Sequence, residues 1–161
     1  MTAPDPAAPP AEGDIAPAFD LPTDGGGTVS LASLLGGKIV LYFYPKDDTS
    51  GCTKEAIGFS ESLDAFAAAG ATVIGVSKDG VKKHDAFKAK HALTVTLAAD
   101  EDGTTCEAYG VWVEKSMYGR KYMGIDRATF VIGPDGRIAQ AWRKVKVPGH
   151  VAAVLKAAQA L

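Results

Sequence analysis

Residues 38–44 form a continuous run of β-branched and aromatic side chains (KIVLYFY) that stops at Pro45. Continuous rather than alternating hydrophobicity is typical of a strand buried on both faces, as in a parallel sheet covered by helices. A second run of this kind, ATVIGVS at residues 71–77, follows a stretch with apolar residues at helical spacing. A strand, a helix and a second strand in this order form a βαβ unit with a parallel pair. The chain is therefore expected to adopt an α/β fold.

The rest of the chain extends this pattern and then changes it. The spacing predicts a polar helix, a third strand and one or two helical turns, at residues 82–91, 94–98 and 104–109. Two further apolar runs, at residues 127–132 and 137–142, flank Gly-Pro-Asp-Gly, which is a strong hairpin signal. Apolar residues at helical spacing from Val151 to Leu161 predict a closing helix with one buried stripe. A βαβ start and a ββα finish predict a thioredoxin-like fold, with a central mixed sheet flanked by helices.

The length of 161 residues corresponds to a single domain. Residues 1–13 (MTAPDPAAPPAEG) are rich in Pro and Ala and lack both the basic start and the apolar core of a secretory signal. We expect this segment to be a disordered tail and residues 14–161 to form the domain. With no export signal and only two cysteines, the expected location is the reducing cytoplasm.

Charge and hydropathy exclude two classes of partner. The 17 basic and 19 acidic residues nearly balance and form no basic stripe, so nucleic acid is not an expected partner. The small basic cluster of Arg143, Lys144 and Lys146 is expected on the polar face of a strand. No apolar run reaches the length that spans a membrane, so no membrane partner is expected either.

Cys52 follows the first buried strand and a short polar loop, in the first turn of the next helix. The carboxyl ends of parallel strands are where α/β folds bind ligands, and the N-terminus of a helix favours a thiolate over a thiol. The alternative is that the cysteine is a small buried hydrophobic residue, which is common in such folds. Gly51 and the polar residues before it are not typical of a core, so the sequence favours a reactive thiol.

A reactive thiol at this position needs more than the helix terminus. A free cysteine has a pKa of about 8.5, and lowering it by two units requires about 2.7 kcal/mol. A helix terminus typically contributes about 0.3–1 kcal/mol. A nearby cation must therefore contribute, and Arg127 is the candidate, because an arginine among apolar neighbours needs a partner.

The pattern Pro45-x-x-x-Thr49-x-x-Cys52 resembles the active-site signature of the peroxiredoxins, and FYPKDDTSGCTKEA is similar to the bacterioferritin-comigratory (Bcp) or PrxQ branch. Further similar segments cover nearly all of the chain after residue 13. They are AP-x-F-x-L at residues 16–21, VIGVS at 73–77, AYGVW at 108–112, KSMYGRKYMGIDRATF at 115–130 and IGPDG at 132–136.

The resemblance implies a thiol-dependent peroxidase with Cys52 as the nucleophile that becomes a sulfenic acid. Thr49 matches the threonine whose hydroxyl bonds the thiolate and the peroxide. Pro45 matches the proline that shields the sulfur. Arg127 matches the arginine that holds the thiolate and the peroxide. Glu55 matches an acidic position that supports this network. No cofactor is expected.

The chain departs from the family pattern at the resolving cysteine. Many PrxQ proteins carry this residue on the helix of the first cysteine, where this chain has Ile57, and others carry it in the segment that matches residues 85–90, which holds no cysteine here. Cys106 is the remaining candidate, either as a resolving cysteine or as a buried core residue. We expect a one-cysteine cycle in which an external thiol, such as thioredoxin or glutaredoxin, reduces the sulfenic acid. The resemblance also favours a monomer or a weak dimer.

The same residues give less support to other functions. A disulfide exchanger would need a second cysteine at the position of Glu55, and a cysteine phosphatase would need an arginine at that of Gly58. Three histidines lie outside any motif and are expected to be solvated or to cap helices: His84, His91 and His150. They form no ligand pairs with the cysteines, so no metal is expected. The non-enzymatic alternative is a thioredoxin-fold binding or holdase module with a non-catalytic thiol.

Overall fold

The computed structural model describes residues 9–161. Most of the segment expected to be disordered, residues 1–8, lies outside the described residues. The remainder of that segment contacts the domain. The Gly13 amide donates to the Ile138 carbonyl at 2.8 Å, and the Arg143 guanidinium donates to the Pro10 carbonyl at 2.9 Å. The boundary expected at residue 14 stays a prediction.

The βαβ start and the ββα finish expected from the sequence are both present. The strands are β1 (Asp20–Pro22), β2 (Thr28–Ser30), β3 (Lys38–Phe43), β4 (Ala71–Ser77), β5 (Thr96–Ala99), β6 (Trp112–Met117), β7 (Arg120–Ile125), β8 (Ala128–Ile132) and β9 (Ile138–Trp142). The helices are the 3₁₀ turn η1 (Asp24–Gly26), α1 (Leu31–Leu34), α2 (Ser50–Glu61), α3 (Leu63–Ala68), α4 (Val81–His91), α5 (Thr104–Ala108) and α6 (His150–Ala160).

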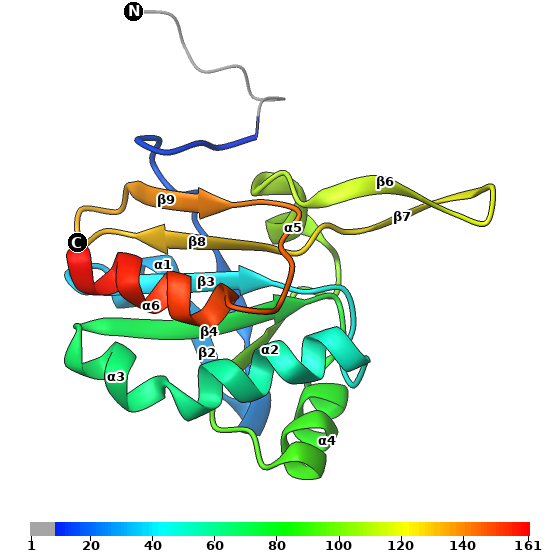
Figure 1. The fold of residues 1–161 in the computed structure, drawn as a ribbon, viewed down its shortest axis with the longest axis horizontal. Coiled ribbons are helices and arrows are strands. Elements are labelled where there is room, and N and C mark those ends of the chain that lie inside the picture. The colour runs from blue at the N-terminus through cyan, green and yellow to red at the C-terminus, as the bar shows by residue number, and fades with distance from the viewer. Residues whose placement is uncertain (1–8) are drawn as a thin grey trace, which may run out of the picture.

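Five strands form the central sheet in the order β5-β4-β3-β8-β9 (Figure 1). The strands β3, β4 and β5 run parallel, whereas β8 is antiparallel to β3, and β9 is antiparallel to β8. The expected mixed sheet flanked by helices is therefore confirmed. Because β3 and β8 are antiparallel neighbours, the start of β8 lies beside the end of β3, where Ala128 pairs with Phe43.

The strand β3 is buried on both faces, as its continuous hydrophobicity predicts. Its alternate side chains belong to two separate cores: Ile39, Leu41 and Phe43 to one, Val40 and Tyr42 to the other. All five are fully buried. Successive side chains of a strand point to opposite faces, so a strand in the middle of a covered sheet needs apolar residues at every position.

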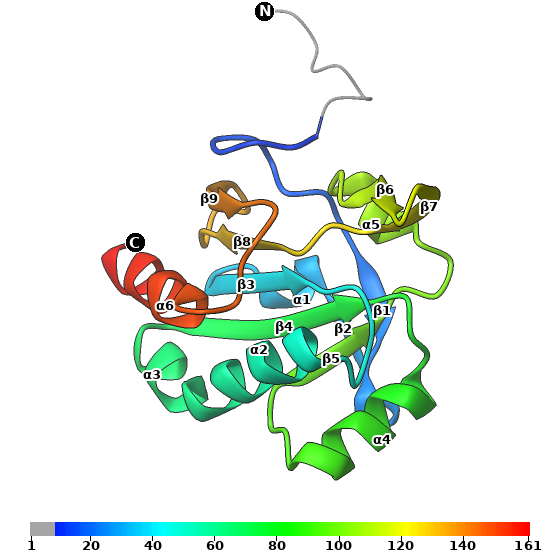
Figure 2. The same cartoon turned by 45° about the vertical axis from the view of Figure 1, so that its right-hand side comes forward.

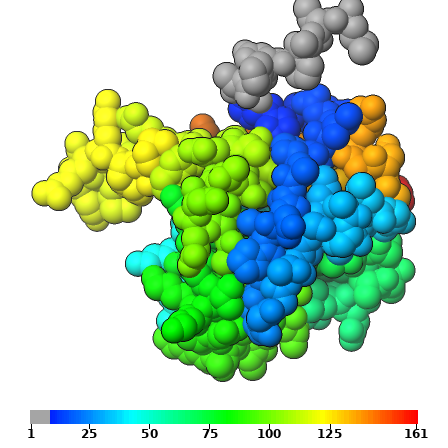
Figure 3. All heavy atoms as spheres, turned by 180° about the vertical axis from the view of Figure 1, so that it is seen from behind, coloured from blue at the N-terminus to red at the C-terminus, as the bar shows by residue number. Residues whose placement is uncertain are grey.

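Each face of the sheet has its own cover (Figure 2). The helices α2, α3, α4 and α6 contribute to one core, with Phe59 and Phe66 among its fully buried side chains. The opposite core takes Leu31 from α1 and Tyr109 from the end of α5. Figure 3 shows this second side of the molecule, where the N-terminal segment in blue crosses the face. Among residues 9–161, none of the helices has the length and apolar character that crossing a bilayer requires.

The antiparallel hairpin β6–β7 was not expected from the sequence. It forms a separate two-stranded sheet that extends away from the body of the molecule (Figures 1 and 3). Most of its side chains are exposed or half-buried. A hairpin that packs little of itself against the core has no reason to show the alternating pattern that predicts a half-buried strand.

Two expectations about the C-terminal third are wrong. The strand β9 ends at Trp142, so Arg143, Lys144 and Lys146 do not form the polar face of a strand. The Arg143 guanidinium instead donates to the carbonyl oxygens of residues 10, 109 and 110. In α6 the buried stripe contains Val154 and Ala158, but Leu161 lies after the helix and is 48% exposed.

Candidate active site

Cys52 is the third residue of α2, as expected, and its side chain is 1% exposed. The first N–H groups of a helix have no partner within the helix. The N-cap residue Thr49 makes no side-chain capping bond, and the first helical bond of this turn runs from the Thr53 amide to the Thr49 carbonyl. The sulfur of Cys52 therefore lies at the positive end of a helix that can stabilise negative charge.

Arg127 provides the cation that this site requires. Its Nη2 donates to Cys52 Sγ at 3.3 Å. The residue immediately precedes β8, and the start of β8 lies beside the end of β3, from which the chain leads through a loop into α2. The sheet order thus joins two residues that are 75 positions apart.

Glu55 completes a three-residue group, one helical turn after Cys52. Its Oε1 accepts from Arg127 Nη1 at 2.8 Å, and its side chain is fully buried. Burial raises the pKa of Glu55 to about 7, although the Arg127 charge and hydrogen bond act in the opposite direction. Within the described residues, Glu55 Oε2 has no hydrogen-bond partner. The guanidinium of Arg127 therefore bridges the thiol and the carboxyl group.

The Arg127 guanidinium remains charged in this setting. Burial alone would lower its pKa, but the charges of Glu55 and Cys52 and its hydrogen bonds to both side chains raise the pKa above its ordinary value. An arginine that stays protonated can donate to sulfur and to carboxylate through fixed, planar N–H groups. The site is thus a thiol held against a permanent cation.

The loop from β3 to α2 carries the other two residues expected in the site. The Thr49 hydroxyl donates to the Lys46 carbonyl at 2.9 Å, and Thr49 is exposed. A hydroxyl that donates one hydrogen bond can still accept others. Pro45 is also exposed, and it lines a groove of about 430 Å³ together with residues of the β6–β7 hairpin. The structure therefore brings Arg127 and Glu55 to Cys52, with Thr49 and Pro45 on the adjoining loop.

Comparison with known proteins identifies the family. The model of the AhpC/TSA family matches residues 13–141. The chain belongs to this family. Among relatives, peroxiredoxin Bcp of Xanthomonas campestris is 49% identical over 144 residues, which cover 88% of this chain and 90% of the relative. Peroxiredoxin Bcp of Bacillus subtilis is also 49% identical, over 89% of this chain and 92% of the relative. The protein is therefore an enzyme of the peroxiredoxin class.

Solved structures agree with this assignment. Peroxiredoxin Q of Xanthomonas campestris superposes with a TM-score of 0.86 at 44% identity, over 97% of this chain and 98% of that chain. A structure of the bacterioferritin comigratory protein from the same organism, described for its alkyl peroxide reduction activity, has a TM-score of 0.84 at 46% identity, over 88% of this chain and 90% of that chain. The Bcp/PrxQ resemblance and the thioredoxin-like fold expected from the sequence are both confirmed.

The second cysteine of this peroxiredoxin lies in the other core. Cys106 is fully buried in the cluster on the opposite face of the sheet from Cys52. Its amide donates to Asp100 Oδ2 at 2.8 Å. Burial, together with a hydrogen bond and the charge of Asp100, raises the pKa of the Cys106 thiol well above its ordinary range. Both cysteines are free.

Two of the three histidines are buried, so the expectation that they are solvated or capping is wrong for His84 and His150. His84 is fully buried on α4, three residues before Phe87 on the same face. His150 Nε2 lies 2.8 Å from Thr129 Oγ1. Burial and the charge of Arg127 lower the pKa of His150 to about 4. The three-residue spacing between His84 and Phe87, which places both on one face of a helix, could have predicted that His84 is buried.

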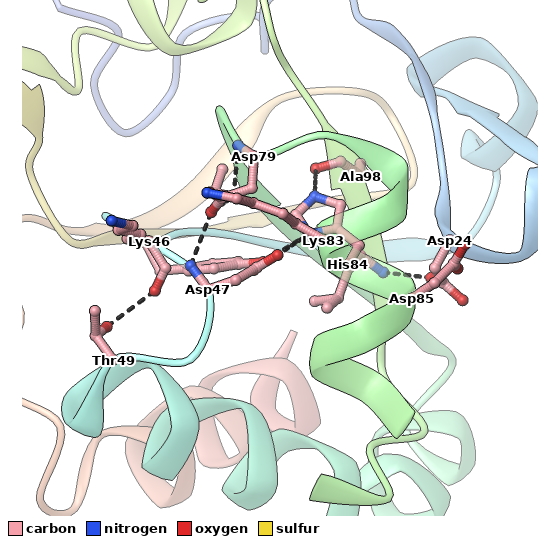
Figure 4. A network of polar contacts seen from close by, with 12 residues as sticks. Asp24, Lys46, Asp47, Thr49, Asp79, Lys83, His84, Asp85 and Ala98 are labelled. Atoms are coloured by element: carbon pink, nitrogen blue, oxygen red, sulfur yellow. Dashed lines mark hydrogen bonds and ion pairs between the residues drawn. The ribbon is translucent and has the colours of Figure 1, made fainter. Parts of the chain in front are cut away.

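A second polar group joins the loop before Cys52 to α4, and none of its residues was predicted to be functional. Tyr44, Asp47 and His84 are buried, and Asp47 is hydrogen-bonded to both of the others. Figure 4 shows Asp47 beside His84. The third histidine, His91, contacts the neighbouring Asp48 at the surface, with 2.7 Å between Nε2 and Oδ1. Over residues 9–161, no three His, Cys, Asp or Glu side chains gather as metal ligands would.

Proposed function

We propose that this peroxiredoxin reduces hydrogen peroxide and organic hydroperoxides, with Cys52 as the nucleophile. The observation that carries the proposal is the 3.3 Å contact between Arg127 Nη2 and Cys52 Sγ at the start of α2. A guanidinium that donates to sulfur favours the thiolate, which is the nucleophilic form. The alkyl peroxide reduction activity named for the Xanthomonas campestris relative supports organic hydroperoxides as substrates.

The reaction is a displacement at oxygen. The Cys52 thiolate attacks one oxygen of the hydroperoxide, so that an S–O bond forms while the O–O bond breaks. The leaving oxygen departs with the electron pair and takes up a proton, which gives water from hydrogen peroxide or an alcohol from an organic hydroperoxide. Cys52 is oxidised to a sulfenic acid. Arg127 and the free N–H groups of the first turn of α2 stabilise the charge that moves between sulfur and oxygen.

The neighbouring residues have supporting roles. The Thr49 hydroxyl lies three residues before Cys52 and donates its hydrogen to the Lys46 carbonyl, so its oxygen accepts a hydrogen bond from the incoming peroxide. Pro45 shields the sulfur from water. Glu55 holds the Arg127 guanidinium in place through its 2.8 Å contact. These roles come from the family resemblance, and the loop and helix geometry support them.

The cycle uses one cysteine and an external thiol. Ile57 and residues 85–90 provide no resolving cysteine on α2 or α4. Cys106 is separated from Cys52 by the sheet, and its raised thiol pKa disfavours the thiolate. The external thiol condenses with the sulfenic acid, which releases water and leaves a mixed disulfide. A second thiol then releases Cys52 and carries the new disulfide away.

We also propose a class of reductant, a compartment and an oligomeric state. A thiol protein such as thioredoxin or glutaredoxin supplies the two electrons, in a reducing compartment such as the cytoplasm, and the enzyme acts as a monomer or a weak dimer. A cycle that depends on an external thiol needs a reducing environment to regenerate that thiol.

The test is intact-mass measurement after one equivalent of hydrogen peroxide, with and without a sulfenic-acid trap. The wild type should form a trapped adduct on Cys52 and no internal disulfide. The Cys52→Ser variant should form no adduct, whereas Cys106→Ser should behave as the wild type does. A wild type that reacts no faster than a free thiol would overturn the proposed function, and an internal disulfide would overturn the one-cysteine cycle.

A further inference from the structure

Asp47 lies in the loop that leads into the Cys52 helix, and residues outside the active site hold it in place. The Asp47 side chain is 5% exposed, although the residue lies on a loop between exposed neighbours. Its Oδ1 accepts from the Tyr44 hydroxyl at 2.5 Å. Its Oδ2 lies 2.6 Å from Nδ1 of His84, which is labelled beside it in Figure 4. A buried carboxylate costs free energy unless it is paired and hydrogen-bonded, so these partners are required to keep Asp47 inside.

His84 joins this carboxylate to two other elements. The residue lies on α4 and is fully buried, and its Nε2 is 2.9 Å from the Ala98 carbonyl of β5. A carbonyl oxygen can only accept, so Nε2 carries a hydrogen. When Nδ1 also carries a hydrogen, the ring is an imidazolium paired with Asp47. Burial lowers the pKa of His84, but the hydrogen bond to Asp47 and the charge of Asp47 outweigh this effect. The pKa of His84 is therefore raised above its ordinary value.

The backbone of Asp47 is held as firmly as its side chain. Its amide donates to Asp79 Oδ2 at 2.8 Å. Asp79 is itself fixed, since Oδ2 accepts from the Ser77 hydroxyl at 2.8 Å and Oδ1 lies 3.6 Å from Lys83 Nζ. The peptide unit before Asp47 is therefore anchored to the end of β4 and the start of α4.

That peptide unit is the one that holds the Thr49 hydroxyl. Its carbonyl belongs to Lys46 and accepts from Thr49 Oγ1 at 2.9 Å, while its N–H is the Asp47 amide. A peptide unit is planar, so the direction of its N–H determines the direction of its carbonyl. A rotation of this unit would move the Thr49 hydroxyl. Pro45 precedes the same unit along the loop, so it would move as well.

We propose that His84 is a positioning residue of the Cys52 site, which acts through Asp47 and the Lys46–Asp47 peptide to orient Thr49 and Pro45. The inference rests on the proposed function, because Thr49 and Pro45 matter only for the reaction with peroxide. His84 itself touches none of the reacting groups. Through His84, the α4 helix and the β5 strand help to hold the loop that carries Pro45 and Thr49.

The reactions of Cys52 with hydrogen peroxide and with iodoacetamide distinguish a positioning role of His84 from a general effect on the fold. Iodoacetamide reacts with the thiolate, which the Arg127 contact favours, whereas the reaction with peroxide also needs the oriented loop. The His84→Ala variant should react with hydrogen peroxide at least tenfold more slowly, while its alkylation rate at the same pH changes less than twofold. The matched control is His91→Ala on the same helix, which removes the surface contact to Asp48 and should leave both rates within twofold.

Milder variants keep the test valid if His84→Ala does not fold. The Tyr44→Phe variant removes only the hydroxyl that bonds Asp47, and it should slow the peroxide reaction two- to fivefold without an effect on alkylation. The His84→Gln variant keeps an amide donor for Asp47 and should recover part of the rate that His84→Ala loses. Adding Asp47→Ala to His84→Ala should cause little further loss, because both act through one contact.

The outcomes also separate this inference from the proposed function. Peroxide rates equal to wild type in the folded His84 and Tyr44 variants would overturn the positioning role and leave the peroxidase intact. An equal fall in the peroxide and alkylation rates would overturn it as well, because the contact would then act on the thiolate or on the fold. A wild type without a rapid peroxide reaction would instead overturn the proposed function itself.

Discussion

Cys52 and Cys106 occupy the same kind of position in two parts of one molecule. Each is the third residue of a helix that follows a strand of the parallel part of the sheet, β3 for Cys52 and β5 for Cys106. Their side chains are 1% and 0% exposed. The two thiols are thus similar in burial and in position along a helix, but the first amides of α5 donate to Asp100, whereas α2 has no side-chain cap.

The two thiols differ in the charge beside them. Cys52 faces the Arg127 guanidinium at 3.3 Å, whereas the charged neighbour of Cys106 is the Asp100 carboxylate, which accepts from the Cys106 amide. A cation favours the thiolate, and a carboxylate opposes it. The comparison teaches that the partner across the fold, rather than local position or burial, decides which cysteine is suited to catalysis.

The largest expected effect comes from removing the Cys52 thiol. Cys52→Ser should lower peroxide consumption by more than about a thousandfold, since the nucleophile is lost. Cys106→Ser should stay within about twofold of the wild type, because a one-cysteine cycle does not use it. The assay is steady-state peroxide consumption with dithiothreitol and, separately, with thioredoxin. Loss of turnover in Cys106→Ser with thioredoxin alone would identify Cys106 as a resolving cysteine and break the comparison.

Alkylation compares the two thiols within one protein. At pH 6, iodoacetamide should modify Cys52 about a hundredfold faster than Cys106, because Arg127 favours the Cys52 thiolate whereas the Cys106 thiolate is disfavoured. Peptide mass spectrometry after timed quenching measures both rates. Similar rates at the two positions would mean that the Arg127 contact confers no advantage.

Substitution of Arg127 tests directly whether the cation beside Cys52 is needed for the reaction with peroxide. Arg127→Ala should slow the reaction of Cys52 with peroxide by more than about tenfold, equivalent to at least about 1.4 kcal/mol in the barrier. Arg137→Ala provides the matched control, since this arginine is exposed and donates to the Gly13 carbonyl, away from the cysteine. The single-turnover rate of sulfenic acid formation is the measurement. An unchanged rate in Arg127→Ala would contradict the assignment of the site.

Glu55 should make stability depend on pH on the Cys52 side. Its pKa is raised from an ordinary 4.5 to about 7, so its stabilising contribution is fully present below pH 4.5 and is lost as the pH rises through 7. Between pH 5 and 8, the free energy of unfolding of the wild type should fall by about 2 kcal/mol relative to Glu55→Gln. Urea titrations at both pH values measure the difference. His150 is present in both proteins, so its own titration cancels.

The smallest effect is expected on the Cys106 side. Asp100 accepts from the amides of Thr105 and Cys106 at the start of α5, at 3.2 and 2.8 Å. Asp100→Asn keeps one acceptor oxygen and should cost about 1 kcal/mol of stability in a thermal melt. Cys106 should remain unreactive to iodoacetamide, because the variant places no cation beside its sulfur. Rapid alkylation of Cys106 in this variant would show that the carboxylate charge alone keeps the thiol inert.

The features that were predicted correctly depend on local pattern. The continuous hydrophobicity of residues 38–44 and 71–77 predicted β3 and β4, and the change to helical spacing placed Cys52 in the first turn of α2. The hairpin signal at residues 133–136 predicted β8 and β9. The β6–β7 hairpin was missed because its exposed side chains show no burial pattern.

The sequence by itself determined the α/β fold, the position of Cys52 and the need for a cation beside it, because periodicity and motif spacing describe neighbours along the chain. Only the tertiary structure decided which groups meet. The antiparallel pairing of β3 with β8 brings Arg127 to Cys52, and the packing of α4 buries His84 against Asp47. The sheet puts Cys106 in the other core. Such contacts join distant segments, so they follow from strand order and packing and leave no periodic signal in the chain.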